Sequence, residues 1–246
     1  MSEYPAILGI YSQLLETKIG EGSTQKTRDA LTYWYVRQLS AESFEIQPLN
    51  AHHVPSGVRS TLDGVDFLRQ YSPEPGYYAT HTVPALKTLA KKLKSGEEAL
   101  AAGDLDEAER QFIKALMIDD LNVDANFGLG EVYTQKDDVA KLKEVLDRLL
   151  SIDEAFHEEN RVKFNSFGIN LRKHGHYDDS IRYYQKSLEI IDSDENVYFN
   201  MARSFYEMGD LDQCTINLRK ALALAPSFVE AQKFLRYCQK EQPAAS

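Results

Sequence analysis

The chain of 246 residues contains few cysteines, a single tryptophan and no long apolar run. Its two cysteines, Cys214 and Cys238, are too few for a disulfide framework and lack the paired spacing of a zinc site, which favours a reducing compartment. The longest uncharged apolar stretch near the start, Ala6 to Ile10, is far too short for a membrane-spanning helix, and no basic segment precedes it as in a signal peptide. We therefore expect a cytoplasmic protein.

Basic residues are also scarce. The chain has 28 Lys and Arg against 38 Asp and Glu, which gives a net charge of −10. This charge repels the phosphates of nucleic acids and of anionic membranes, so we expect neither as a partner. The hydrophobic share of 43% is large enough to close a core.

The sequence does contain an internal repeat. The segment AGDLDEAERQFIKAL around Gly103 returns as HGHYDDSIRYYQKSL around Gly175 and as MGDLDQCTINLRKAL around Gly209. A separation of 34 residues between the last two is typical of a helix-turn-helix repeat. In the first copy the glycine suits a helix C-terminus with positive φ, and Asp104 can cap the next helix.

These segments resemble the tetratricopeptide repeat, which places small and bulky apolar residues at set positions of a 34-residue unit. In the first copy Ala108, Phe112 and Ala115 stand at such positions on one helix face. A further unit at 123–156 is degenerate, because Asp137 replaces the turn glycine and Leu142 stands where a small residue is expected. We expect the repeat domain at residues 89–242, with units at 89–122, 123–156, 161–194 and 195–228 and a capping helix at 229–241.

Four residues, 157–160, separate the second unit from the third, and we expect them to lengthen a helix. Residues 1–88 show no repeat, and their apolar pattern changes to period 2. The alternation predicts a β-hairpin over residues 32–49, a further strand over residues 6–12 and a short helix within residues 63–71. The fold class is therefore mostly α: a tetratricopeptide-repeat superhelix preceded by a small α+β domain.

The resemblance also implies a binding groove. In this family the first helix of each unit lines a concave face, with its second, fifth, ninth, twelfth and thirteenth residues pointing inward. The positions that follow over the last three units are Phe127, Glu131, Asn165, Ile169, Arg172, Lys173, Asn196, Phe199, Arg203 and Tyr206.

The groove residues suggest the chemistry of a partner. Arg172, Lys173 and Arg203 form a positive spot in an acidic protein and favour an acidic or carboxylate-bearing peptide. In the alternative interpretation, the aromatic residues only pack between neighbouring units and the charges are solvated.

Two other motifs are weaker. In the segment IGEGSTQKT, Gly20, Lys26 and Thr27 have the spacing of a phosphate-binding loop, but Gln25 stands where that loop needs glycine, so we expect a loop joining two strands. The pairs His52/His53 and His174/His176 have no convergent ligand set. We predict no catalytic residues, no metal and no cofactor.

The sequence thus favours a non-enzymatic adaptor or scaffold that binds a partner peptide or protein segment in the concave groove. One alternative is a ligand- or nucleotide-sensing protein in which residues 1–88 are the sensor. Another is a scaffold that associates with itself, with Phe199 and Tyr206 at the interface.

Overall fold

A computed structural model of the chain describes residues 6–19, 26–191 and 193–241. It divides into two compact units. The N-terminal unit contains the described residues of 1–95 together with 113–122, and the helical unit contains those of 96–112 and 123–246. Within the described residues, no helix is both long and apolar enough to cross a lipid bilayer.

The N-terminal unit is built on an antiparallel sheet with strand order β4-β3-β2-β1-β5. One helix, α1, follows β4, and its first turn is capped by Asp63, whose side chain accepts a hydrogen bond from the backbone N–H of Asp66. The bounds are β1 Ala6–Ile19, β2 Lys26–Gln38, β3 Ser43–Pro48, β4 Ser60–Asp63, α1 Gly64–Gln70 and β5 Ser72–Pro73.

Alternation along β2 sends its side chains to two faces of this sheet. Val36 lies in a buried cluster with Phe44 and with Phe67 of α1. On the opposite face, the ring of Tyr33 stacks on that of Tyr77 with centroids 4.1 Å apart. The predicted hairpin and the predicted short helix are both present, and the predicted fold class is confirmed.

The sheet is larger than the sequence indicated. Strand β1 continues to Ile19 instead of ending near residue 12, because its second half pairs with β2 through backbone hydrogen bonds that need no apolar alternation. Strands β4 and β5 are too short to produce a pattern. In the rejected phosphate-loop motif, Lys26 and Thr27 open β2, where such a loop would need a helix, and residues 20–25 lie outside the described residues.

Residues 113–122 belong to the N-terminal unit because their polar groups bond to the loop after β3. The side-chain amide of Asn50 donates to the carbonyl of Ile118 at 2.8 Å. The hydroxyl of Ser56 donates to the buried carboxylate of Asp119 at 2.7 Å. The N-terminal unit therefore includes residues 113–122, which the 34-residue period assigns to the first repeat.

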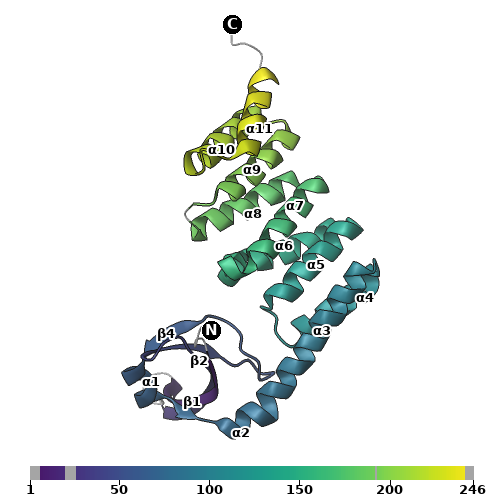
Figure 1. Ribbon diagram of the computed structural model, residues 1–246. Helices are drawn as coiled ribbons and strands as arrows, with labels where there is room; N and C mark the ends of the chain where they lie inside the picture. The colour runs from purple at the N-terminus through teal and green to yellow at the C-terminus, as the bar shows by residue number, and fades with distance from the viewer. Residues whose placement is uncertain (1–5, 20–25, 192, 242–246) are drawn as a thin grey trace. The chain divides into compact units, whose positions relative to one another are not determined.

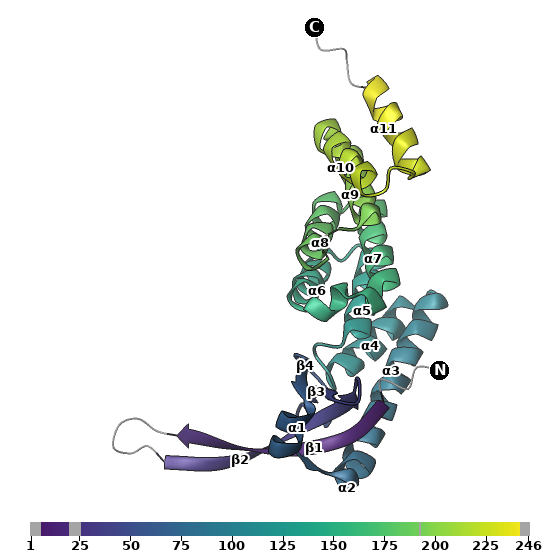
Figure 2. The same ribbon diagram turned by 60° about the vertical axis from the view of Figure 1, so that its left-hand side comes forward.

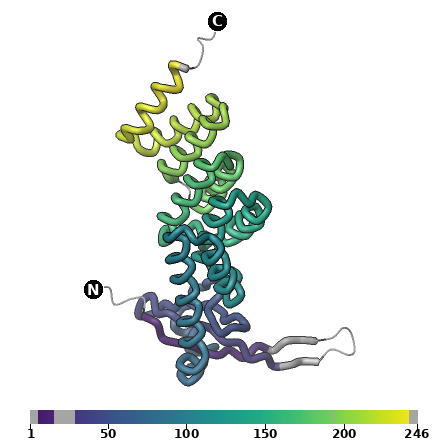
Figure 3. The backbone as a smooth tube through the Cα atoms, turned by 90° about the vertical axis from the view of Figure 1, so that its right-hand side faces the viewer, coloured from purple at the N-terminus to yellow at the C-terminus, as the bar shows by residue number. Residues whose placement is uncertain are grey.

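Helices follow in sequence to the end of the described chain. Figures 1 and 3 show α5/α6, α7/α8 and α9/α10 as successive antiparallel pairs, with α11 beside α10. The bounds are α2 Pro75–Tyr77, η2 Tyr78–Thr82, α3 Val83–Ala101, α4 Leu105–Leu116, α5 Val123–Lys136, α6 Val139–Ser151, η3 Asp153–Phe156, η4 Glu158–Asn160, α7 Arg161–Lys173, α8 Tyr177–Ile190, α9 Glu195–Met208, α10 Leu211–Leu224 and α11 Val229–Glu241.

The turns between paired helices all use left-handed backbone. Gly103, Gly175 and Gly209 have φ of 79°, 84° and 89°. At the degenerate second turn Asp137 adopts the same region with φ of 55°. Aspartate tolerates this conformation better than most residues with a Cβ, so the turn forms without glycine.

The four inserted residues do not lengthen a helix, so that expectation is wrong. His157 separates the 3-10 turns η3 and η4, and the other three inserted residues, 158–160, form η4. The turn η3 buries Phe156, whose ring lies 5.6 Å from Phe164 and 5.2 Å from Tyr183 between centroids. Burial of this ring favours the tight turns over a straight continuation of α6.

Helices approach closely where a glycine faces an aromatic ring. A Cβ added at Gly96 would lie 2.7 Å from the ring of Phe112, and one at Gly128 would lie 2.4 Å from the same ring. A Cβ at Gly168 would lie 2.5 Å from Tyr184. These glycines are therefore required by the packing, and the rings fill the space that they leave.

We predict that Gly128→Ala lowers the free energy of unfolding by about 1 to 3 kcal/mol, because the added methyl group displaces the buried Phe112 ring or the helix that carries it. Chemical denaturation measures the change. Gly76→Ala is the matched control, since a Cβ there meets nothing within 4 Å. Equal stabilities of the two variants would contradict this account of the packing.

Candidate functional site

The predicted groove residues come from three helices, α5, α7 and α9, and the structure places their aromatic rings mainly in packing contacts. Phe127 is 6% exposed, and its ring lies edge-on to Phe167 at 5.9 Å. Phe199 is half-buried, with its ring 4.9 Å from that of Phe228. Tyr206 is also half-buried, 5.2 Å from Phe234 of α11. These rings therefore offer a partner little free area.

Two of the predicted cations do come together. Arg172 of α7 is only 7% exposed, and its guanidinium Nη1 lies 3.4 Å from a carboxylate oxygen of Glu207 in α9. Burial lowers the pKa of Arg172, and the positive charge of Arg203 lowers that pKa further. Arg203 is exposed and makes no ion pair within the described part of the chain. The charge of Arg172 is therefore balanced by one carboxylate and opposed by a second guanidinium group.

Tyr184 of α8 lies within the field of both arginines. Its burial raises the pKa of its hydroxyl, while the charges of Arg172 and Arg203 act in the opposite direction. The hydroxyl donates a hydrogen bond to the backbone carbonyl of Asn165 at 3.5 Å. The cluster of Arg172, Arg203, Glu207, Tyr184 and Asn165 is called the arginine cluster below.

Asn165 contributes an unsatisfied group to this cluster. Its side-chain oxygen is buried and has no hydrogen-bond partner among the described residues. A buried acceptor without a donor costs about 1 to 3 kcal/mol.

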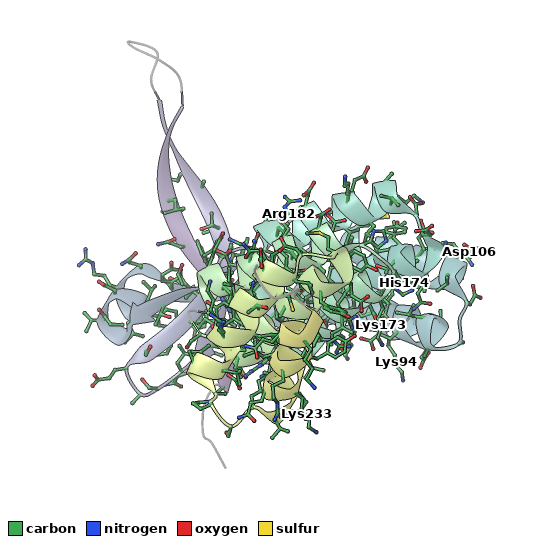
Figure 4. The ribbon with its side chains drawn as sticks, turned by 90° about the horizontal axis from the view of Figure 1, so that it is seen from above. Lys94, Asp106, Lys173, His174, Arg182 and Lys233 are labelled. Atoms are coloured by element: carbon green, nitrogen blue, oxygen red, sulfur yellow. The ribbon has the colours of Figure 1, made fainter. Side chains whose placement is uncertain are left out.

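The other predicted groove residues lie outside the arginine cluster, and each makes only local contacts or is exposed. Lys173 ends α7 and is exposed, and Figure 4 shows it and His174 away from Arg182 of α8. Asn196 donates to the neighbouring Glu195 at 3.3 Å. Glu131 accepts from Gln135 at 3.5 Å, and Ile169 is half-buried.

The sequence prediction omitted Glu207, although the signal was present. Glu207 is the thirteenth residue of the unit at 195–228, and the thirteenth place is one that the family directs inward. Tyr184 could not have been assigned to the site from its position, because it belongs to a second helix of a pair and is 0% exposed. Only the packing of α8 against its neighbours brings it beside the arginines.

A second charged cluster lies elsewhere in the helical unit. Glu109 accepts hydrogen bonds from Lys136 at 2.6 Å, from Lys141 at 2.8 Å and from the hydroxyl of Tyr133 at 3.1 Å. These donors, Lys136 first and Lys141 next, lower the pKa of Glu109 to about 2. The carboxylate is fully used within the protein, so this cluster stabilises the fold and leaves no group for a ligand.

The histidine pairs gain no metal-binding partners in the structure. Across the described ranges, no group of three or more His, Cys, Asp or Glu side chains is arranged to hold a metal ion. His53 has a positive φ of 63°, and its Nδ1 lies 2.7 Å from the hydroxyl of Tyr77. His174 bonds through Nδ1 to the carbonyl of Asn170 at 2.9 Å.

Comparison with known families decides what the helix pairs are. Models of the tetratricopeptide repeat match residues 93–154 and residues 195–228. The chain contains tetratricopeptide repeats. Such repeats stack into extended binding surfaces, and the chain accordingly has the general role of a protein–protein interaction scaffold.

Solved structures similar to this tetratricopeptide repeat protein include MamA and PilF. The crystal structure of MamA is 19% identical over 63% of this chain and 82% of its own, with a TM-score of 0.47. PilF of Pseudomonas aeruginosa is 18% identical over 63% and 69%, with a TM-score of 0.47. MamA from Desulfovibrio magneticus RS-1 is 15% identical over 63% and 85%, with a TM-score of 0.46. No curated protein sequence matches the chain significantly.

We predict that Glu109 makes stability depend on pH. Because its pKa is lowered from 4.5 to about 2, its contribution is present above pH 4.5 and is lost as the pH falls from 4.5 through about 2. At neutral pH, Glu109→Gln should lower the free energy of unfolding by about 2 kcal/mol. The difference from wild type should shrink over that acidic range when both are followed by denaturation.

The matched control is Glu144→Gln, at an exposed position of α6, which should leave the stability within about 0.5 kcal/mol of wild type at every pH. A constant difference between wild type and Glu109→Gln from neutral pH to pH 2 would contradict the assignment.

Proposed function

We propose that this scaffold binds an acidic segment of a partner protein on the surface that α7 and α9 form, with Arg172 and Arg203 as the recognition residues. The observation that carries the proposal is the unequal charge of the arginine cluster, in which Arg172 pairs with one carboxylate, that of Glu207, while Arg203 adds a second positive charge close enough to lower the pKa of Arg172. A guanidinium binds a carboxylate through two parallel hydrogen bonds, which suits Asp or Glu side chains of a bound segment.

Burial strengthens this preference. Arg172 lies in a largely desolvated position, where a charge interacts more strongly than in water. Arg203 is exposed and can meet an incoming carboxylate first. The chain as a whole has a net charge of −10 and repels an acidic segment over most of its surface. The local positive charge of the arginine cluster therefore favours binding of such a segment at this one place.

Asn165 gives the site a second kind of contact. Its side-chain oxygen is buried and accepts from no donor among the residues described, so a backbone N–H of a bound peptide reaches it only if the Asn165 side chain turns outward on binding. The combination favours a peptide over a small carboxylate, since a small anion carries no amide donor.

The decisive variant is Arg203→Glu, because Arg203 is exposed and its replacement should leave the fold intact. In affinity capture from native lysate followed by mass spectrometry, we expect wild type to recover a partner with an acidic segment. Arg203→Glu should weaken the binding of that partner at least about tenfold, since a charge-assisted hydrogen bond contributes roughly 1.5 to 3 kcal/mol.

The matched control is Arg182→Glu. Arg182 is exposed on α8 and pairs with Asp147 at 2.8 Å, and Figure 4 places it away from Lys173. This variant should bind as wild type does. If Arg203→Glu recovers the same partner in the same amount, the arginine cluster is not the binding site.

Glu207 provides an independent test. Its carboxylate is 45% exposed and occupies one side of Arg172, so it competes with a partner carboxylate. We expect Glu207→Gln to bind the recovered partner more tightly than wild type in calorimetry, because the competing negative charge is gone. Weaker binding by this variant would mean that Glu207 itself contacts the partner, which would count against an acidic segment.

A further inference from the structure

The two cysteines of the chain lie side by side in the structure. Cys214 belongs to α10 and Cys238 to α11, and their Sγ atoms are 3.6 Å apart. Both are thiols. Figure 2 shows α11 beside α10 at the yellow end of the helical unit. Because the sequence contains no other cysteine, a disulfide within the chain can join only these two residues.

The spacing of the pair is close to that of a disulfide. A disulfide bond holds its two sulfur atoms about 2.05 Å apart. The Sγ atoms of Cys214 and Cys238 are already in van der Waals contact, so they need to approach by only about 1.5 Å. An approach of this size requires rotation of the two side chains and a small shift of α11, and no change of fold.

The surroundings shield the pair from solvent. Both side chains are 0% exposed, and they share a cluster with Ala202, Leu218 and Ala231. Burial raises the pKa of the Cys214 thiol, and its contact with Cys238 raises that pKa further. The thiolate is the form that attacks an oxidant, so the closed structure keeps the pair in its reduced and slowly reacting form.

Helix α11 is the element whose movement would expose the pair. Of its side chains at 229–240, only Ala231 and Cys238 are buried, and both are small. Phe234 and Leu235 add partly buried contacts to the same cluster. Elements with few buried apolar contacts open at a lower free energy than the rest of a fold. Local opening of α11 would therefore give an oxidant access to both thiols.

We propose that Cys214 and Cys238 form a redox-sensitive pair, in which a low-molecular-weight disulfide such as oxidised glutathione closes a covalent bond between α10 and α11. One cysteine thiolate attacks a sulfur of the oxidant, breaks its S–S bond and releases one glutathione thiolate. The second cysteine thiolate then attacks the protein sulfur of the mixed disulfide and releases the other. The two glutathione thiolates take up the protons that the protein thiols lose, and the two electrons lost by the cysteines reduce the oxidant.

The bond would hold α11 against the helices before it. Tyr206 of α9 packs on α11, with its ring 5.2 Å from that of Phe234 and its hydroxyl 3.3 Å from that of Tyr237. Oxidation would prevent α11 from opening and would keep these contacts closed, whereas reduction would allow the helix to separate. Neither cysteine belongs to the arginine cluster, so the pair is independent of the proposed site for an acidic segment.

Incubation of the reduced full chain with oxidised glutathione, followed by intact mass spectrometry without reductant, tests the proposal. Wild type should lose the mass of two hydrogen atoms and carry no bound glutathione. Proteolysis should then give one linked pair of peptides that contains Cys214 and Cys238. The Tm of the oxidised chain should exceed that of the reduced chain by about 5 to 10 °C, since a cross-link restricts the unfolded state, and dithiothreitol should reverse the shift.

Cys214→Ala and Cys238→Ala are the matched controls. In the first repeat unit Ala108 stands at the place of Cys214, so the first variant should preserve the packing. Each variant keeps one thiol, should gain no internal bond, and should have a Tm that oxidised glutathione does not raise. A wild type that keeps its reduced mass, retains glutathione, or shows no rise in Tm on oxidation would overturn the proposal. Arg203→Glu should form the same bond as wild type, so this test and the partner-binding test fail separately.

Discussion

The ring of Phe112 fills the space that Gly96 and Gly128 leave open, and the same arrangement returns where Tyr184 lies against Gly168. These contacts fix how closely neighbouring helices can approach, because a Cβ at any of the three glycines would overlap a ring. The position of α8 against α7 follows from that distance. The meeting of α7, α8 and α9 at the arginine cluster depends on it in turn.

In the arginine cluster, the positive charge of Arg172 is held in an electrostatically unfavourable position. Arg172 is buried beside a second arginine, and burial and like charge both disfavour its charged form. The single carboxylate of Glu207, 3.4 Å away and partly in solvent, offsets this only in part. By contrast, Glu109 is surrounded by two lysines and a tyrosine hydroxyl and is fully satisfied. The arginine cluster has more positive than negative charge, whereas the charge of Glu109 is fully neutralised by its donors. Only the arginine cluster therefore suggests a ligand.

Local sequence rules were sufficient for the elements with strong patterns. The turns at Gly103, Gly175 and Gly209 have the left-handed backbone that a glycine after a helix indicates. The rules failed where tertiary contacts outweigh local preference. Phe156 is buried at the end of the 3-10 turn η3, and a second 3-10 turn, η4, follows where a longer helix was expected. Strand β1 continues through residues whose pairing depends on the backbone of β2.

The 34-residue period, the turn residues and the alternation in residues 32–49 determined by themselves that the chain would form paired helices after a β-containing region, because these patterns act over a few neighbouring residues. The resemblance to the tetratricopeptide repeat, with its inward-facing positions, pointed to Arg172 and Arg203. Tertiary structure alone decided that Phe127 would be buried, that Tyr184 would join the two arginines, and that Leu14 and Leu31 would stay exposed. Burial and charge coupling depend on residues far apart in the chain, and no local pattern records them.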